Sequence, residues 1–193
     1  MSFAECREHE SPVVRGPVAR RAQKLEAVKK AGVLPYPASV KRPPRIAEAL
    51  KDFAKLAKQK KEVILAGRIK AQRGHGGATF FDIEDGSTSL TTGGSAKIQA
   101  FLKKDGVGEK SYKLFLDNYD IGDFLEVRGV LFLTKAGEKT LEVADCKMLA
   151  KSLLPLPEKW HGLQDVEERF RKRYLDLIMN PEIKKKFELR SQI

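Results

Sequence analysis

Residues 62–70, EVILAGRIK, and residues 78–84, ATFFDIE, decide the fold. In both stretches an inward, mostly apolar set of side chains alternates with a more polar set, as in a β-strand with one face toward the core and one toward water. Gly74, Gly76 and Gly77 lie between the two stretches, and glycine adopts the backbone dihedrals that a tight reversal needs. The pattern therefore predicts an antiparallel hairpin.

Three further strands and one helix are expected after this hairpin. The alternation recurs over residues 97–102, 125–133 and 141–143, and the inner face of the fourth strand is expected to run from Leu125 to Leu133. Between the third and fourth strands, apolar residues follow the spacing of one face of an amphipathic helix: they are Tyr112, Phe115, Leu116 and Tyr119. This order predicts a five-stranded β barrel of the OB-fold class, with the N-terminal helices packed on it.

The second strand is expected to turn one aromatic ring toward solvent. With Thr79, Phe81 and Ile83 facing inward, Phe80 falls on the outer face. An exposed ring on a barrel face suits a protein that holds single-stranded nucleic acid, because every base offers a flat surface for stacking. The alternative is that Phe80 or Phe101 packs under a loop or a neighbouring domain, and the pattern alone leaves both readings open.

The charge of the chain favours a polyanionic partner. The 193 residues carry a formal net charge of +11, and 41% of them are hydrophobic, which is enough to fill a core. Residues 1–61 hold 15 Lys or Arg against 6 Asp or Glu, so most of the excess precedes the barrel. Basic surfaces also occur in proteins that touch no nucleic acid, so the charge does not assign the function by itself.

Four segments are expected along the chain. Residues 1–16 show no periodicity and are expected to be disordered, and residues 17–61 form a basic helical region. Residues 62–150 form the barrel, and residues 151–193 form a linker and the start of a further domain. Within the basic region, a helix over residues 44–61 is expected to pack on the barrel through its apolar face.

The first helix of the basic region begins at Pro17 and is cationic on its outer faces. The side chains concerned are Arg20, Arg21, Lys24 and Lys29. A charged run of this kind is often only a solvated helix face. The size of the local excess favours contact with phosphate groups instead, and the affinity of such contacts falls steeply with salt.

Two helices are expected after the barrel. Asp165 is placed to cap a helix that runs through Ile178. Residues 180–182, Asn-Pro-Glu, have the order of a cap, a first-turn proline and a first-turn acid. Because the sequence stops at Ile193 inside this second helix, we expect a fragment of a longer protein.

No catalytic residue, metal site or membrane span is expected in these residues. His9, His75 and His161 have no Cys, Asp or Glu at metal-ligand spacing, and no nucleophile elbow, catalytic carboxylate pair or nucleotide-binding loop is present. Cys6 and Cys146 fit no disulfide framework, and no apolar run approaches the roughly 20 residues of a membrane span. The sequence predicts a cytoplasmic binding module that holds no cofactor of its own.

Several stretches resemble one known family. Residues 153–165, LLPLPEKWHGLQD, and residues 168–177, ERFRKRYLDL, closely resemble the linker of class II lysyl-tRNA synthetases, which joins their anticodon-binding barrel to their catalytic domain. Residues 63–68 and 78–81 resemble the first two barrel strands of that family, and residues 31–37, AGVLPYP, resemble its N-terminal element. The resemblance covers nearly everything after about residue 18.

The resemblance implies four anticodon contacts, at Arg68, Phe80, Gln99 and Glu138. The lysine anticodon is rich in uridine, and a ring at Phe80 can stack on an unpaired base. A carboxylate at Glu138 can accept the N–H of uracil, an amide at Gln99 can both donate and accept, and Arg68 can serve a carbonyl or a phosphate. The segment before Gln99, residues 86–96, is longer than in the family, so the register of Gln99 is the least constrained.

The resemblance also implies an activity for the intact protein. It would be a homodimeric lysine-tRNA ligase that uses ATP and Mg²⁺ to charge tRNA(Lys), which it would bind through the anticodon, whereas the present stretch ends before the catalytic domain and could be a monomer. Two alternatives stay open. One is the equivalent domain of an aspartyl- or asparaginyl-tRNA synthetase, and the other is a free-standing module that binds single-stranded nucleic acid or protein.

Overall fold

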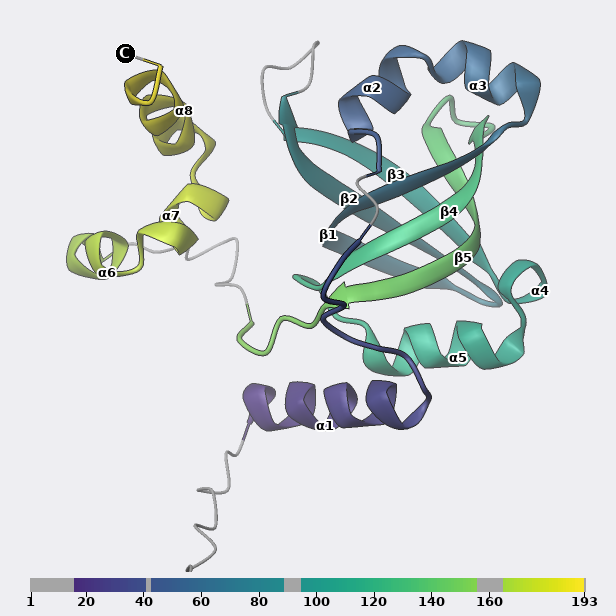
Figure 1. Cartoon of the computed structure of the whole chain (residues 1–193), viewed down its shortest axis with the longest axis horizontal. Coiled ribbons are helices and arrows are strands. Elements are labelled where there is room, and N and C mark those ends of the chain that lie inside the picture. The colour runs from purple at the N-terminus through teal and green to yellow at the C-terminus, as the bar shows by residue number, and fades with distance from the viewer. Residues whose placement is uncertain (1–15, 41–42, 89–94, 156–164, 193) are drawn as a thin grey trace, which may run out of the picture.

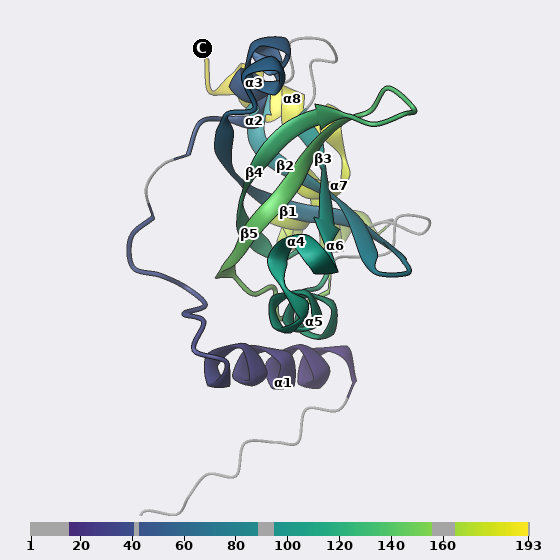
Figure 2. The same cartoon turned by 90° about the vertical axis from the view of Figure 1, so that its right-hand side faces the viewer.

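The computed structural model describes residues 16–40, 43–88, 95–155 and 165–192. Within them, five strands form a closed barrel in the order β1-β2-β3-β5-β4, and only β3 and β5 pair in parallel (Figures 1 and 2). The strands are β1 (Glu62–His75), β2 (Ala78–Thr88), β3 (Ser95–Lys103), β4 (Phe124–Leu133) and β5 (Lys139–Ala150). The predicted barrel is confirmed, whereas the disorder expected over residues 1–16 falls almost wholly outside the described part.

The interior of the barrel follows the predicted alternation, with one exception. Phe81 and Ile83 of β2 and Ile98 of β3 are buried, as expected for the inward set. Leu133 was expected on the inner face of β4, but it is 59% exposed. The pairing of β4 with β1 reaches only Val130, so the last residues of β4 extend beyond the barrel wall and Leu133 has no core to enter.

One end of the barrel is covered by the helix predicted between the third and fourth strands (Figure 1). This helix is α5 (Glu109–Asn118), and the short α4 (Lys104–Val107) precedes it. Three of the four predicted apolar residues are buried: Tyr112, Phe115 and Tyr119. The fourth prediction was wrong, because Leu116 is 40% exposed. It follows Phe115 by one residue and therefore points about 100° away around the helix, off the side that meets the barrel.

The N-terminal helices lie at opposite ends of the barrel (Figures 1 and 2). α1 (Pro17–Lys30) lies along α5, and α2 (Ile46–Lys51) and α3 (Phe53–Gln59) cover the other end. The single helix predicted over residues 44–61 is interrupted at Asp52, whose φ of −93° and ψ of 13° depart from helical values. The interruption lets α2 contact β2 and β3 while α3 contacts β4.

Three short helices follow the barrel and lie beside it (Figure 1). They are α6 (Val166–Arg171), α7 (Arg173–Met179) and α8 (Pro181–Arg190). Asp165 caps α6 as predicted, since its Oδ1 accepts the backbone N–H of Glu167 at 2.9 Å. The continuous helix predicted from Asp165 is broken at Lys172, where φ is −111° and ψ is 51°. Asn180 makes no side-chain cap at the start of α8, and its Nδ2 donates to Asp176 instead.

The described residues contain neither a membrane-spanning helix nor a candidate metal site. None of the described helices is both long enough and apolar enough to cross a membrane. The same residues hold no group of three or more His, Cys, Asp or Glu side chains that could bind a metal ion. Residues 156–164, which carry part of the linker resemblance, lie outside the described part of the chain.

A buried ammonium group joins α5, the turn after it and the segment that leaves β5. Lys151 is 4% exposed, and its Nζ donates to the Asn118 carbonyl at 2.7 Å and to the Asp123 carboxylate at 2.7 Å. The same Nζ lies 2.5 Å from Oδ2 of Asp120, and Lys24 of α1 reaches Oδ1 of Asp120 at 2.6 Å. This cluster therefore fastens α1 to the barrel as well.

The cluster makes the stability of the fold depend on pH. Burial raises the pKa of Asp120, but hydrogen bonds and positive charge from Lys151 and Lys24 outweigh burial, so its pKa lies below the ordinary value. A lowered pKa stabilises the fold above the unfolded-state pKa of about 4, and this stabilisation is lost as the pH falls through the folded-state value. We expect the urea concentration at the unfolding midpoint to decrease as the pH is lowered below about 4. This decrease should be less steep in Asp120→Asn. An identical decline in Asp120→Asn would contradict this assignment.

Candidate nucleic-acid interface

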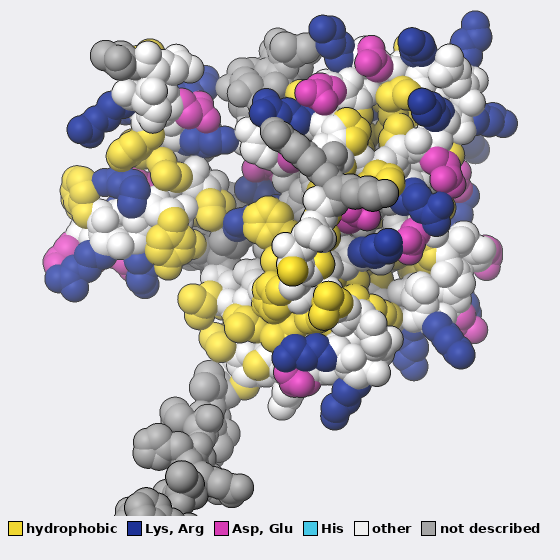
Figure 3. Space-filling view, viewed as in Figure 1, with side chains coloured by type: hydrophobic (Ala, Val, Ile, Leu, Met, Phe, Trp, Pro, Cys, Tyr) yellow, Lys and Arg dark blue, Asp and Glu magenta, His cyan; other side chains and the backbone are white. Residues whose placement is uncertain are grey.

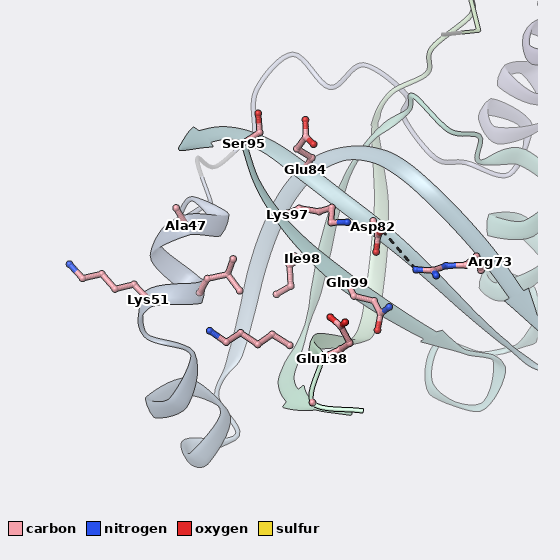
Figure 4. Close-up of a pocket in the computed structure, with 13 residues that line it drawn as sticks. Ala47, Lys51, Arg73, Asp82, Glu84, Ser95, Lys97, Ile98, Gln99 and Glu138 are labelled. Carbon is pink, nitrogen blue, oxygen red and sulfur yellow. Dashed lines mark hydrogen bonds and ion pairs between the residues drawn. The ribbon is translucent and has the colours of Figure 1, made fainter. Parts of the chain in front are cut away.

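The outer face of β2 and β3 carries two of the predicted contact residues next to a pocket. In the strand register Phe80 lies opposite Phe101, and Asp82 lies opposite Gln99. A pocket of about 640 Å³ opens between α2, these strands and the turn that joins β4 to β5 (Figure 4). Its polar lining includes Gln99 and Glu138 together with Arg73, Asp82, Lys97, Lys51 and Lys139.

Phe80 is part of a cluster of three aromatic rings outside the barrel interior. It alternates with the buried Thr79 and Phe81 and is itself partly exposed. The ring of Phe80 stacks on Phe101 with centroids 4.4 Å apart and planes at 20°, and Phe132 follows at 6.3 Å from Phe101. Phe80 thus packs against Phe101 on one side of its plane, and Phe132 is tilted by 52° to Phe101. The partly exposed ring of Phe80 is the part of this apolar cluster on which a base can stack.

Gln99 and Glu138 come from distant parts of the sequence and meet at the pocket (Figure 4). Gln99 belongs to β3, and its Oε1 accepts a hydrogen bond from Thr140 of β5 at 2.9 Å. Glu138 lies in the β4–β5 turn, held by a hydrogen bond from its backbone N–H to Oγ1 of Thr134. Among the described residues no partner is recorded for the Glu138 carboxylate, so it is available to accept hydrogen bonds from a ligand.

Arg68 lies apart from Phe80, although its cross-strand partner Glu84 lines the pocket that Gln99 and Glu138 share. Glu84 lies four residues along β2 from Phe80, so the two positions are roughly 13 Å apart. The guanidinium of Arg68 lies 4.5 Å above the ring of Phe124, and it does not line the pocket. Burial lowers the pKa of Arg68, and the charge of Glu84 partly offsets this effect. Arg68 is thus held against the barrel wall, at the margin of the site.

Sequence reasoning missed Arg73. Arg73 was expected in the reversal between the first two strands, together with the glycines that follow it. In the structure β1 continues to His75, and a β-bulge between Ile69 and Ala71 shifts the register by one residue, so that Arg73 lies opposite Phe80 on the outer face. Arg73 is 69% exposed in its side chain and lies 4.0 Å from Asp82. No feature of the sequence signals the bulge.

Asp82 organises the cations of the pocket. Although it belongs to the outward set of β2, it is only 8% exposed. Its carboxylate accepts a hydrogen bond from Lys97 at 3.3 Å and also faces Arg73 (Figure 4). Because both cations are held on the same side of the strands as Phe80, the pocket offers positive charge next to a stacking surface.

Further positive charge lies around α2 and α3, beside the pocket. Figure 3 shows Lys and Arg side chains gathered at this end of the molecule. The exposed lysines of these two helices and of the residues after them are Lys51, Lys55, Lys58, Lys60 and Lys61. A polyanion bound at the pocket would therefore meet a basic surface next to it.

The four predicted cations of α1 differ in their surroundings. Arg21 donates to the carbonyl groups of Ser152 and Ile121 at 2.8 and 3.0 Å, and Lys24 pairs with Asp120. These two side chains hold α1 on the barrel. Lys29 pairs with Glu26, and Arg20 is exposed without a recorded partner in the described residues. The helix itself lies at the end of the barrel opposite α2 (Figure 2).

Comparison with known proteins defines the class of this barrel. Residues 63–149 match the family model described as an OB-fold nucleic acid binding domain, which bears the name tRNA anti-codon. The barrel is thus similar to that family, and its aromatic cluster lies on the face that OB-folds use for ligands.

The homology extends beyond the barrel, to lysine-tRNA ligases. The chain is 46% identical over 173 residues to such a ligase from Carboxydothermus hydrogenoformans, covering 90% of this chain and 33% of that protein. It is 44% identical over 182 residues to one from Halalkalibacterium halodurans, covering 91% and 34%. It is 53% identical over 131 residues to one from Aquifex aeolicus, covering 68% and 21%. The predicted resemblance is confirmed, and the chain spans about a third of the length of the first two relatives.

Proposed function

We propose that this chain binds the anticodon loop of tRNA(Lys), and that the intact protein charges this tRNA with lysine. The observation that carries the proposal is the position of the Phe80–Phe101 ring pair, outside the barrel interior and next to a pocket lined by Gln99 and Glu138. A stacking ring beside hydrogen-bonding side chains is how proteins hold and read unpaired bases.

The proposed contacts follow from the chemistry of each side chain. An unpaired base stacks on the ring cluster at Phe80, and the free carboxylate of Glu138 accepts the N3–H of uracil. Gln99 donates to a carbonyl oxygen of a base. Arg73 and Lys97 are placed to contact the phosphates on either side of that base, and Arg68 contacts a flanking nucleotide at the margin of the site.

The basic helix α1 has a second role in this proposal. Arg20 and Lys29 contact the tRNA backbone at the far end of the barrel, which adds sequence-independent affinity. Arg21 and Lys24 contribute indirectly, because their hydrogen bonds to the barrel keep the helix in place.

The rest of the proposed activity concerns the intact protein. It would bind ATP and Mg²⁺ outside these residues, activate lysine and transfer it to tRNA, as a homodimer in the cytoplasm. The name that the three relatives share favours lysine over the aspartyl and asparaginyl alternatives.

Binding of anticodon stem-loops tests the proposal. The 193-residue chain is titrated at one fixed salt concentration with three stem-loops that share a stem and carry the lysine, aspartate or asparagine anticodon. We expect the lysine stem-loop to bind at least about tenfold more tightly than the aspartate one, since each misread base costs about 1 to 3 kcal/mol.

Two outcomes would contradict the proposal in different ways. Tighter binding of the aspartate or asparagine stem-loop would assign the domain to a sibling enzyme. The absence of binding to all three would instead favour a module that recognises another class of ligand.

A further inference from the structure

Thr140 of β5 is a buried residue that contacts Gln99 of β3. The two residues are direct partners in the parallel pairing of β3 with β5. Thr140 alternates with the inward Leu141 and so belongs to the outer face of β5, yet it is 0% exposed. Its hydroxyl is shielded from water and must find its hydrogen-bond partners within the protein.

The hydroxyl of Thr140 has one hydrogen and two acceptors within reach. Oε1 of Gln99 lies 2.9 Å from Oγ1, and the backbone carbonyl of Glu138 lies 3.3 Å from it. The shorter contact assigns the hydrogen to Gln99. The oxygen of the Gln99 amide is therefore engaged, and its NH₂ group remains for the pocket (Figure 4).

This contact determines whether the donor nitrogen or the acceptor oxygen of the Gln99 amide faces the pocket. A glutamine amide has an acceptor oxygen and a donor nitrogen, and a half-turn about its last torsion exchanges them. Without an anchor, Gln99 would serve a carbonyl group or an amino group equally well. With its oxygen held by Thr140, the amide turns its NH₂ group toward the pocket, and that group donates.

We infer that Thr140 is a positioning residue that makes Gln99 a hydrogen-bond donor, so that the site accepts a base with a carbonyl oxygen and rejects one with an amino group. Uracil and cytosine have the same shape and stack alike, but uracil has a carbonyl at C4 where cytosine has an amino group. Thr140 thus contributes to the discrimination of uridine from cytidine. This inference rests on the proposed function, because it concerns the same site.

Substitution of Thr140 tests the inference. In the lysine stem-loop each anticodon uridine is changed in turn to cytidine, and the ratio of the two dissociation constants is measured for each protein. At the position read by Gln99, we expect a ratio of at least about tenfold for the unchanged protein. Thr140→Val keeps the shape of the side chain without its hydroxyl and should reduce this ratio by about fivefold, the value of one hydrogen bond. Thr140→Ser should preserve it.

A matched control is available on the inner face of the barrel. Thr79 is also 0% exposed, and its hydroxyl lies 3.1 Å from the Tyr112 hydroxyl, away from the pocket. Thr79→Val makes the same chemical change and should affect thermal unfolding in a similar way, but it should leave the ratio unchanged.

The possible results separate this inference from the function on which it rests. An unchanged ratio in Thr140→Val, or an equal fall in Thr79→Val, would overturn the role of Thr140 while stem-loop binding by the unchanged protein still supported the function. If the unchanged protein binds no stem-loop, both are overturned.

Discussion

Replacing Phe80 by alanine is expected to weaken binding of the lysine anticodon stem-loop by roughly five- to 150-fold at fixed salt. Stacking of a base on an aromatic side chain is worth about 1 to 3 kcal/mol, and this range corresponds to that loss. Phe80 lies outside the barrel interior, where Phe81 and Ile83 are 1% and 0% exposed, so its removal leaves the core intact. The loss should therefore appear in the dissociation constant, while the free energy of unfolding should change mainly through the lost contact with Phe101, about 0.5 to 1.5 kcal/mol.

Two further variants make the Phe80 experiment specific. Phe80→Trp offers a larger stacking surface and should retain binding. Phe187→Ala removes a ring that is 40% exposed on α8 and does not line the pocket, and it should leave the affinity unchanged. An affinity of Phe80→Ala within twofold of the unchanged protein would contradict the stacking role.

Replacing Lys151 by methionine is expected to lower the free energy of unfolding by about 3 to 5 kcal/mol, the usual cost of removing one partner from a buried ion pair. The side chains of Lys151 and Asp123 are both 0% exposed. Methionine fills a similar volume but leaves the carboxylate of Asp123 without its cation, and Asp120 loses one of its two lysines. Urea denaturation measures the change.

The controls for Lys151 use the same substitution and the same cluster. Lys103→Met breaks an exposed pair with Glu142 and should cost no more than about 1 kcal/mol. Adding Asp123→Asn to Lys151→Met removes the uncompensated buried charge and should recover part of the loss. If Lys151→Met is no more destabilising than Lys103→Met, the cluster does not fasten the fold.

The barrel and most of its outer face could be predicted because they depend on local patterns. A period of two residues predicts that Phe80 and Gln99 face outward, and the apolar stripe that includes Phe115 predicts the helix that covers one end of the barrel. Family resemblance then added Glu138, which alternation could not select because it lies in a turn. The two sources agreed that Arg68, Phe80 and Gln99 lie on the outward face.

Other features depend on contacts that no local pattern records. The bulge after Ile69 turns Arg73 outward through strand pairing, and the interruption at Asp52 separates a helix that contacts β2 and β3 from one that contacts β4. The burial of Lys151 requires carboxylates from a turn 28 residues earlier in the chain. The contact of Thr140 with Gln99 likewise depends on the parallel pairing of two strands that are not consecutive.

The central claim is that the ring of Phe80 stacks on an unpaired base, and intermolecular nuclear Overhauser effects measure this contact directly. The experiment uses the 193-residue chain, labelled at phenylalanine, in complex with the lysine anticodon stem-loop. Effects between the Phe80 ring protons and H5 or H6 of an anticodon uridine are predicted. A complex in which the Phe80 ring shows effects only to Phe101, and none to any base, would contradict the claim.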